Sequence, residues 1–121
     1  MRTSIIAIGA ITAALLAACG GSSDTSPSAP PVTGVSSATV RATPSIQFTP
    51  ATVNLAVGGS ITFAFESVPH NVYFDGAPAG APENVTAPSS NTSVTRTFTT
   101  KGRYAFNCHL HPGMSGVIVV Q

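Results

Sequence analysis

The feature that most restricts the fold is an alternation of apolar residues with polar or small ones across residues 51–65. A period of two places every second side chain on the same face of a β-strand. Two glycines interrupt the alternation at Gly58 and Gly59. We therefore expect a β-hairpin that turns at these glycines and has one apolar face on each arm. Its inward-facing residues would be Ala51, Val53, Leu55, Val57, Ile61, Phe63 and Phe65.

Shorter stretches of the same kind, separated by Gly and Pro, predict further strands at 38–43, 45–49, 71–75, 93–99, 103–108 and 116–121. No segment of useful length has the 3.6-residue period of a helix. Many short strands with frequent turn residues predict an all-β sandwich or barrel. Residues 76–91 are rich in Gly, Pro and Ala, and we expect a long loop there that is either mobile or part of a working surface.

The amino terminus predicts export from a bacterial cytoplasm. One basic residue precedes an apolar run at 5–16, which is too short to span a membrane and resembles a secretion signal over residues 1–18. The run ends in Leu-Ala-Ala-Cys, which resembles the lipobox of bacterial lipoproteins. An ordinary cleaved signal is the alternative. The lipobox implies lipidation of Cys19 and an anchored protein in the cell envelope, facing the periplasm or the exterior.

The next segment predicts a tether between the lipid and the folded part. Residues 19–35 are rich in Gly, Ser and Pro and have almost no large apolar side chains, so they cannot form a core. One domain is then expected at 36–121. Without Arg2, four basic residues balance four acidic ones, and no basic stripe favours a nucleic acid partner.

Residues that bind soft metals are concentrated near the carboxyl end. Apart from Cys19 and the initiator Met, the cysteine, the methionine and two of the histidines fall within seven positions, and the third histidine is His70. A single Cys, Met or His is usually a core or surface residue. However, Cys108, His111 and Met114 recur at intervals of three in a loop with Pro and Gly, where a tight turn could point all three inward.

The types of donor favour copper over zinc. A structural zinc site usually has four strong ligands, and a thioether is a poor member of such a set. Two imidazoles, one thiolate and a weak axial thioether form the site of blue-copper electron-transfer proteins. The loop supplies one of these imidazoles in His111, and His70 is the candidate for the other.

With these residues in view, the sequence resembles the cupredoxins of the plastocyanin and azurin family. The resemblance rests on Pro-His-Asn-Val at 69–72, on residues 48–65, and on the carboxyl-terminal residues Tyr104, Phe106, Cys108, His111, Met114 and Gly116. The spacing from Cys108 to Met114 is similar to the short ligand loop of amicyanin. The family fold implied by this resemblance is a Greek-key β-sandwich with copper near one end.

The resemblance implies one type 1 copper ion with His70, Cys108 and His111 as equatorial ligands and Met114 as the long axial contact. Asn71 would connect the two ligand-bearing segments, with its backbone amide directed at the thiolate. His109 should face solvent, because neighbouring side chains in a strand point to opposite sides. The exposed edge of His111, beside Leu110, Pro112 and Gly113, would be the electron port.

We therefore expect an electron carrier that meets transient redox protein partners, and we expect neither enzymatic activity nor a small-molecule substrate. The alternative is a protein that buffers or delivers copper with the same residues. An enzyme of the copper nitrite reductase kind needs a second copper and more histidines than the three of this chain.

Overall fold

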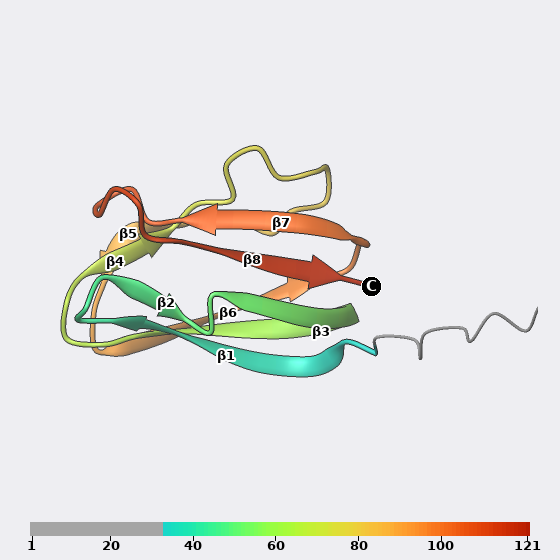
Figure 1. The fold of residues 1–121 in the computed structure, drawn as a ribbon, viewed down its shortest axis with the longest axis horizontal. Helices are drawn as coiled ribbons and strands as arrows, with labels where there is room; N and C mark the ends of the chain where they lie inside the picture. The colour runs from blue at the N-terminus through green and yellow to red at the C-terminus, as the bar shows by residue number, and fades with distance from the viewer. Residues whose placement is uncertain (1–32) are drawn as a thin grey trace, which may run out of the picture.

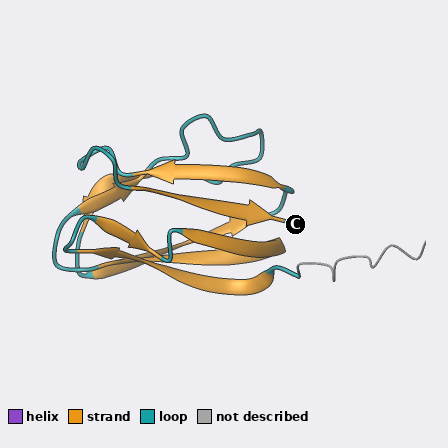
Figure 2. Cartoon of the chain, in the orientation of Figure 1, coloured by secondary structure: helices purple, strands orange, loops and turns teal. Residues whose placement is uncertain are grey.

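The computed structural model describes residues 33–121, which form strands and loops (Figures 1 and 2). The predicted signal, Cys19 and the tether as far as residue 32 lie outside the described residues. Between residues 33 and 121 there is no helix long and apolar enough to cross a membrane. The strands of this part are β1 (Val35–Thr43), β2 (Gln47–Thr49), β3 (Thr52–Phe65), β4 (His70–Val72), β5 (Val85–Ser89), β6 (Thr92–Phe98), β7 (Gly102–Asn107) and β8 (Ser115–Val120).

The strands form a sandwich in which β3 connects the two layers. The larger sheet has the order β2-β1-β3-β8-β7, and β6 also pairs with β3. Residues 52–55 of β3 run parallel to β8, whereas residues 59–65 pair antiparallel with β6. The strands β7 and β8 therefore lie opposite β1 and β6 (Figure 1). The all-β sandwich predicted from the sequence is confirmed.

The reversal of the chain expected within 51–65 is confirmed, and the outer partners of its two arms were not predicted. The apolar alternation is confirmed for five of the seven residues, since Val53, Leu55, Ile61, Phe63 and Phe65 are buried. Ala51 and Val57 were also expected to face inward, but both are exposed. Residues 52–55 pair with β8, whereas residues 59–65 pair with β6 and residues 60–65 with β1, so the two arms of β3 join different layers. The chain reverses direction near Gly58, since residues 52–55 run parallel to β8 and residues 60–65 run parallel to β1, and these two strands point in opposite directions (Figure 1). Gly58 has a φ of 82°, which is readily accessible to glycine. The alternation predicted most of the side chains that face inward, but it carried no information about the neighbouring strand of each arm.

The segment 76–91 is not wholly a loop, because it contains β5. This strand pairs antiparallel with the short β4, with His70 opposite Ser89 and Val72 opposite Val85. Pro88 and the lack of alternation conceal it in the sequence, and a proline is compatible with a strand at a sheet edge. The other predicted strands are present with ends displaced by a few residues, and β1 already begins at Val35.

The core between the layers is built largely from aromatic rings. Phe106 makes edge-to-face contacts with Phe48, Phe63 and Phe74, at centroid distances of 4.9, 5.4 and 6.4 Å. Because Phe106 lies in β7 just before Cys108, this cluster supports the end of the sandwich from which the ligand loop emerges. The start of β4 and the connection between β1 and β2 lie at the same end, on the left of Figure 1.

Candidate metal centre

His70 is the first residue of β4 and is completely buried. Its Nε2 lies 3.0 Å from the backbone carbonyl oxygen of Thr43. A carbonyl can only accept, so Nε2 carries the proton and donates, which leaves the Nδ1 lone pair of the neutral ring free for a metal. Burial lowers the pKa of His70 below its ordinary value, and the nearby His111 lowers it further against the opposing effect of the Thr43 carbonyl. The neutral form that a metal requires is therefore favoured.

Thr43 is a functional residue that sequence reasoning did not find. It ends β1, and its carbonyl also accepts the N–H of Ile46 at 3.1 Å, which closes the turn into β2. The group that orients His70 is thus a backbone atom at a turn. A backbone carbonyl is present at every position, so the residue type gives no indication of this role.

The second ligand-bearing segment is a compact loop between β7 and β8. The N–H of Met114 donates to the carbonyl of His111 at 3.1 Å, with Pro112 and Gly113 between them. Gly113 has a φ of 88°, so this is the arrangement of a type II turn, which favours Pro followed by Gly at its centre. The N–H of Cys108 donates to the carbonyl of Met114 at 2.9 Å and closes the loop. The Pro-Gly pair thereby returns the chain so that both ends of the loop face the site.

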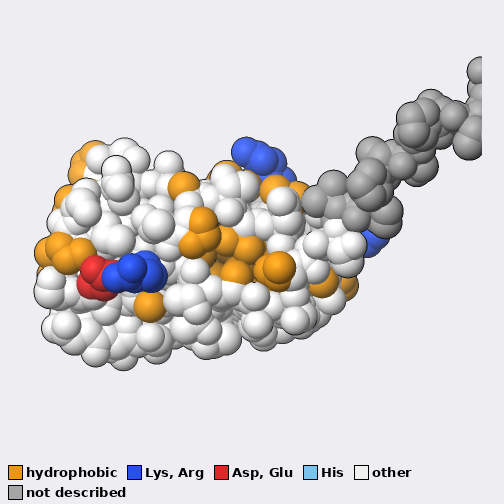
Figure 3. Space-filling view, turned by 60° about the horizontal axis from the view of Figure 1, so that its bottom comes forward, with side chains coloured by type: hydrophobic (Ala, Val, Ile, Leu, Met, Phe, Trp, Pro, Cys, Tyr) orange, Lys and Arg blue, Asp and Glu red, His pale blue; other side chains and the backbone are white. Residues whose placement is uncertain are grey.

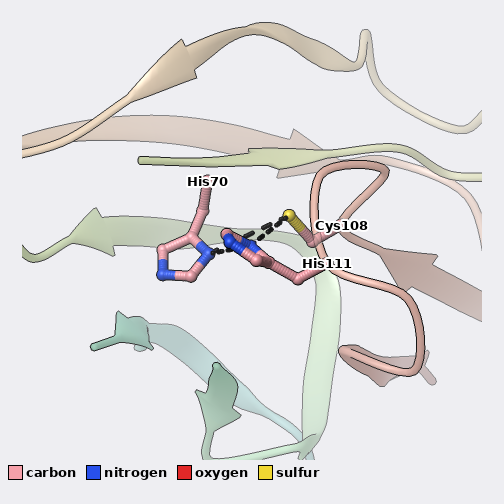
Figure 4. Close-up of side chains that lie close together, drawn as sticks. All are labelled: His70, Cys108 and His111. Carbon is pink, nitrogen blue, oxygen red and sulfur yellow. Dashed lines mark hydrogen bonds between the residues drawn. The ribbon is translucent and has the colours of Figure 1, made fainter. Parts of the chain in front are cut away.

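The two segments bring three donor atoms together (Figure 4). The Nδ1 atoms of His70 and His111 are 3.1 Å apart, and the Cys108 Sγ lies 3.9 Å and 3.6 Å from them, respectively. The three donor atoms form a triangle, and a point equidistant from its corners would be about 2.1 Å from each atom. Zinc–nitrogen bonds are about 2.0–2.1 Å long, and metal–sulfur bonds are slightly longer. Two imidazoles and a thiol on this scale fit a single metal ion. They form the only such group of three among residues 33–121.

Met114 and Asn71 are also buried at this end of the molecule. Met114 closes the ligand loop through its backbone, and its thioether as an axial contact stays a prediction. The Oδ1 of Asn71 accepts the N–H of His109 at 2.7 Å, so the residue after His70 is tied to the residue after Cys108. The expected contact between the Asn71 amide and the Cys108 sulfur also stays a prediction.

His109 is exposed, as expected, and is outside the group of three donors. Its ring stacks on Tyr73 with centroids 3.7 Å apart and planes 8° from parallel. Its Nε2 lies 2.5 Å from Oδ2 of Asp75. This arrangement was not predicted, because Tyr73 and Asp75 are distant from His109 in sequence and have no motif of their own.

Comparisons with known proteins agree with this site. The model of the family described as copper binding proteins, plastocyanin/azurin family, matches residues 35–121. Amicyanin-alpha of Methylorubrum extorquens is 33% identical over 79 residues, covering 63% of this chain and 66% of the amicyanin. Plastocyanin of Prochlorothrix hollandica is 38% identical over 84 residues, covering 61% of this chain and 63% of the plastocyanin. The matched region is less than two thirds of either relative's length.

Similar solved structures include an oxidized mutant of amicyanin. It is 27% identical, has a TM-score of 0.60, and the match covers 69% of this chain and 80% of the amicyanin. A copper-containing nitrite reductase of Thermus scotoductus is 26% identical with a TM-score of 0.57. That match covers 69% of this chain but only 22% of the reductase, so the likeness is to one part of a much larger chain.

Proposed function

Because this chain belongs to the plastocyanin/azurin family of copper binding proteins, we propose that it carries single electrons between redox proteins through one type 1 copper ion. The observation that carries this proposal is the convergence of two imidazoles and one thiol from two separate segments. The donor types match those of blue-copper electron-transfer sites.

Four residues would hold the ion in this proposal. His70, Cys108 and His111 would be the strong ligands, and Met114 the weak one. When bound, the copper would supply a couple between its +1 and +2 oxidation states, which moves one electron without a proton. The protein's part is to keep the donors in place. The hydrogen bond that His70 donates to the Thr43 carbonyl and the bonds within the ligand loop serve this purpose.

The burial of the donors favours one route to the surface. His70 is fully buried and Cys108 is 4% exposed, whereas His111 is partly exposed. Leu110 beside it is 42% exposed. We propose that partners exchange electrons at the edge of His111, through a small and transient contact of the kind that redox encounters usually make.

The surface charge supports docking that does not depend on a strong field. Figure 3 shows a face without histidines, on which charged side chains are few and hydrophobic ones gather in patches. Within residues 33–121 there are four basic and three acidic residues. Partners without a strong opposite charge are therefore the better fit.

The proposal includes no enzymatic activity and places the protein at a membrane of the bacterial cell envelope. A nitrite reductase needs a second copper, and His109 is the one histidine that remains after the donor set is filled. The anchor would be a lipid on Cys19, and the Gly-, Ser- and Pro-rich tether would allow the domain to reach partners near the membrane.

An absorption spectrum of the purified protein with one equivalent of copper(II) tests the proposal. We expect an intense blue thiolate-to-copper band that is absent in Cys108→Ser and retained in the matched control Cys19→Ser. The copper should also resist removal by a chelator after reduction and after reoxidation. A protein that binds copper without colour would contradict the electron carrier and favour copper buffering or delivery.

A further inference from the structure

The side chains of Tyr73, Asp75 and His109 form a cluster next to the donor set but outside it. Tyr73 and Asp75 lie just beyond the end of β4, and His109 directly follows Cys108. The imidazole is flat against the Tyr73 ring and bonded to the Asp75 carboxylate. A side chain that is 44% exposed would ordinarily be free to change rotamer. Here two different contacts hold it in one orientation.

The backbone is fixed at the same point. The amide of His109 donates to Asn71 Oδ1 at 2.7 Å. Tyr73 and Asn107 exchange two backbone hydrogen bonds of 2.9 and 3.0 Å. Cys108 is therefore flanked on both sides by residues that are bound to the chain segment following His70.

The hydrogen bonds inside the ligand loop cannot provide this connection. The amides of Cys108 and Met114 donate to carbonyls of the loop itself, so they shape the loop without fixing its position relative to His70. The contacts of His109 and Asn107 cross between the two segments instead. They connect the segment that carries Cys108 directly to the segment that begins with His70.

We propose that Tyr73, Asp75 and His109 form a clamp that positions Cys108 against His70, with His109 as the positioning residue. This inference rests on the proposed copper site, because it assigns the clamp a part in holding that site's geometry. The stack on Tyr73 would fix the plane of the His109 imidazole. The bond to the Asp75 carboxylate would fix the rotation of the imidazole within that plane. The hydrogen bond from His109 lowers the pKa of the Asp75 carboxyl, and a smaller effect of Asn107 acts in the same direction. Asp75 therefore stays ionised and can accept the bond from the imidazole.

The test compares His109→Ala, which removes both side-chain contacts, with His109→Phe, which retains a flat ring for Tyr73 but no bond to Asp75. The matched control is Lys101→Ala, an exposed residue in the turn between β6 and β7. Three properties are measured on each variant: the visible and electron paramagnetic resonance spectra with copper(II), the affinity for copper(II), and amide hydrogen exchange at positions 108 and 109 of the metal-free protein.

We expect His109→Ala to shift the thiolate-to-copper band, to weaken copper binding about 10-fold, as is typical for lost outer contacts, and to speed exchange at both amides. His109→Phe should recover most of the exchange protection and part of the affinity. If His109→Ala matches Lys101→Ala in spectrum, affinity and exchange, the clamp is refuted. A loss of overall stability with unchanged spectrum and unchanged relative exchange would also refute it.

The metal-free measurement separates this inference from the proposed function. If the unmodified protein shows no blue band, the electron-carrier proposal fails on its own. The exchange rates at positions 108 and 109 would still decide whether His109 holds the Cys108 segment in place.

Discussion

Replacing Phe106 by Leu should destabilise the metal-free protein by about 2 kcal/mol. The Phe106 ring is 2% exposed and has two close edge-to-face neighbours, Phe48 at 4.9 Å and Phe63 at 5.4 Å. Each such pair contributes about 0.5–1.5 kcal/mol beyond the burial of area. Leu remains apolar, so most of the transfer free energy is retained and the lost pairs account for most of the change. Phe106→Ala should cost more, about 3–5 kcal/mol, because it also leaves a cavity.

Urea denaturation followed by circular dichroism measures this, since the chain has no tryptophan to report by fluorescence. The metal-free protein is used because bound copper would add its own binding free energy. A double-mutant cycle with Phe48→Leu should show a coupling of about 0.5–1.5 kcal/mol. Leu110→Ala, at an exposed position, should change stability by no more than about 0.5 kcal/mol. A cost below that control for Phe106→Leu, or a coupling of zero, would refute the aromatic cluster as the support of this end of the sandwich.

Three further predictions concern single contacts. Tyr104→Phe should cost about 1 kcal/mol in urea denaturation, because it removes the 2.7 Å bond from the hydroxyl to the Thr100 carbonyl; an unchanged midpoint would contradict this. Ile46→Asn should raise stability by about 1 kcal/mol, since a β-branched residue at φ 61° is strained and Asn is not, and Asn91→Ala, at φ 51°, should lower it in the same assay. The hydrogen bond from His109 is the main cause that lowers the pKa of Asp75, so the ionised carboxylate stabilises the fold above the ordinary value of 3.8, and this stability is lost as pH falls through the lower folded pKa. Asp75→Asn should therefore lose less stability than the unmodified protein on acidification below 3.8. Parallel plots of stability against pH for the two proteins would argue against the contact.

The donors of the candidate site could be predicted from the sequence through its family resemblance. His70, Cys108 and His111 are unusual residues in a chain with few soft ligands, and their spacing is visible in the sequence as a motif. The type II turn that arranges the loop is also visible there, because Pro112 and Gly113 are the residues such a turn prefers. What could not be predicted is the outer layer of the site. The Thr43 carbonyl carries no residue-specific mark, and Tyr73 and Asp75 meet His109 only through the pairing of distant strands.

The sequence by itself determined most of the strands, most of the inward-facing residues and the set of metal donors, because these depend on local periodicity and on residue chemistry. The tertiary structure decided that the two halves of β3 join different layers and that β5 pairs with β4. It also decided which groups surround the donors. The physical reason is that strand pairing uses backbone N–H and C=O groups, which are the same at nearly every residue. Alternation therefore fixes the face that a side chain occupies, whereas the neighbour it meets across the sheet is chosen only when the whole domain packs.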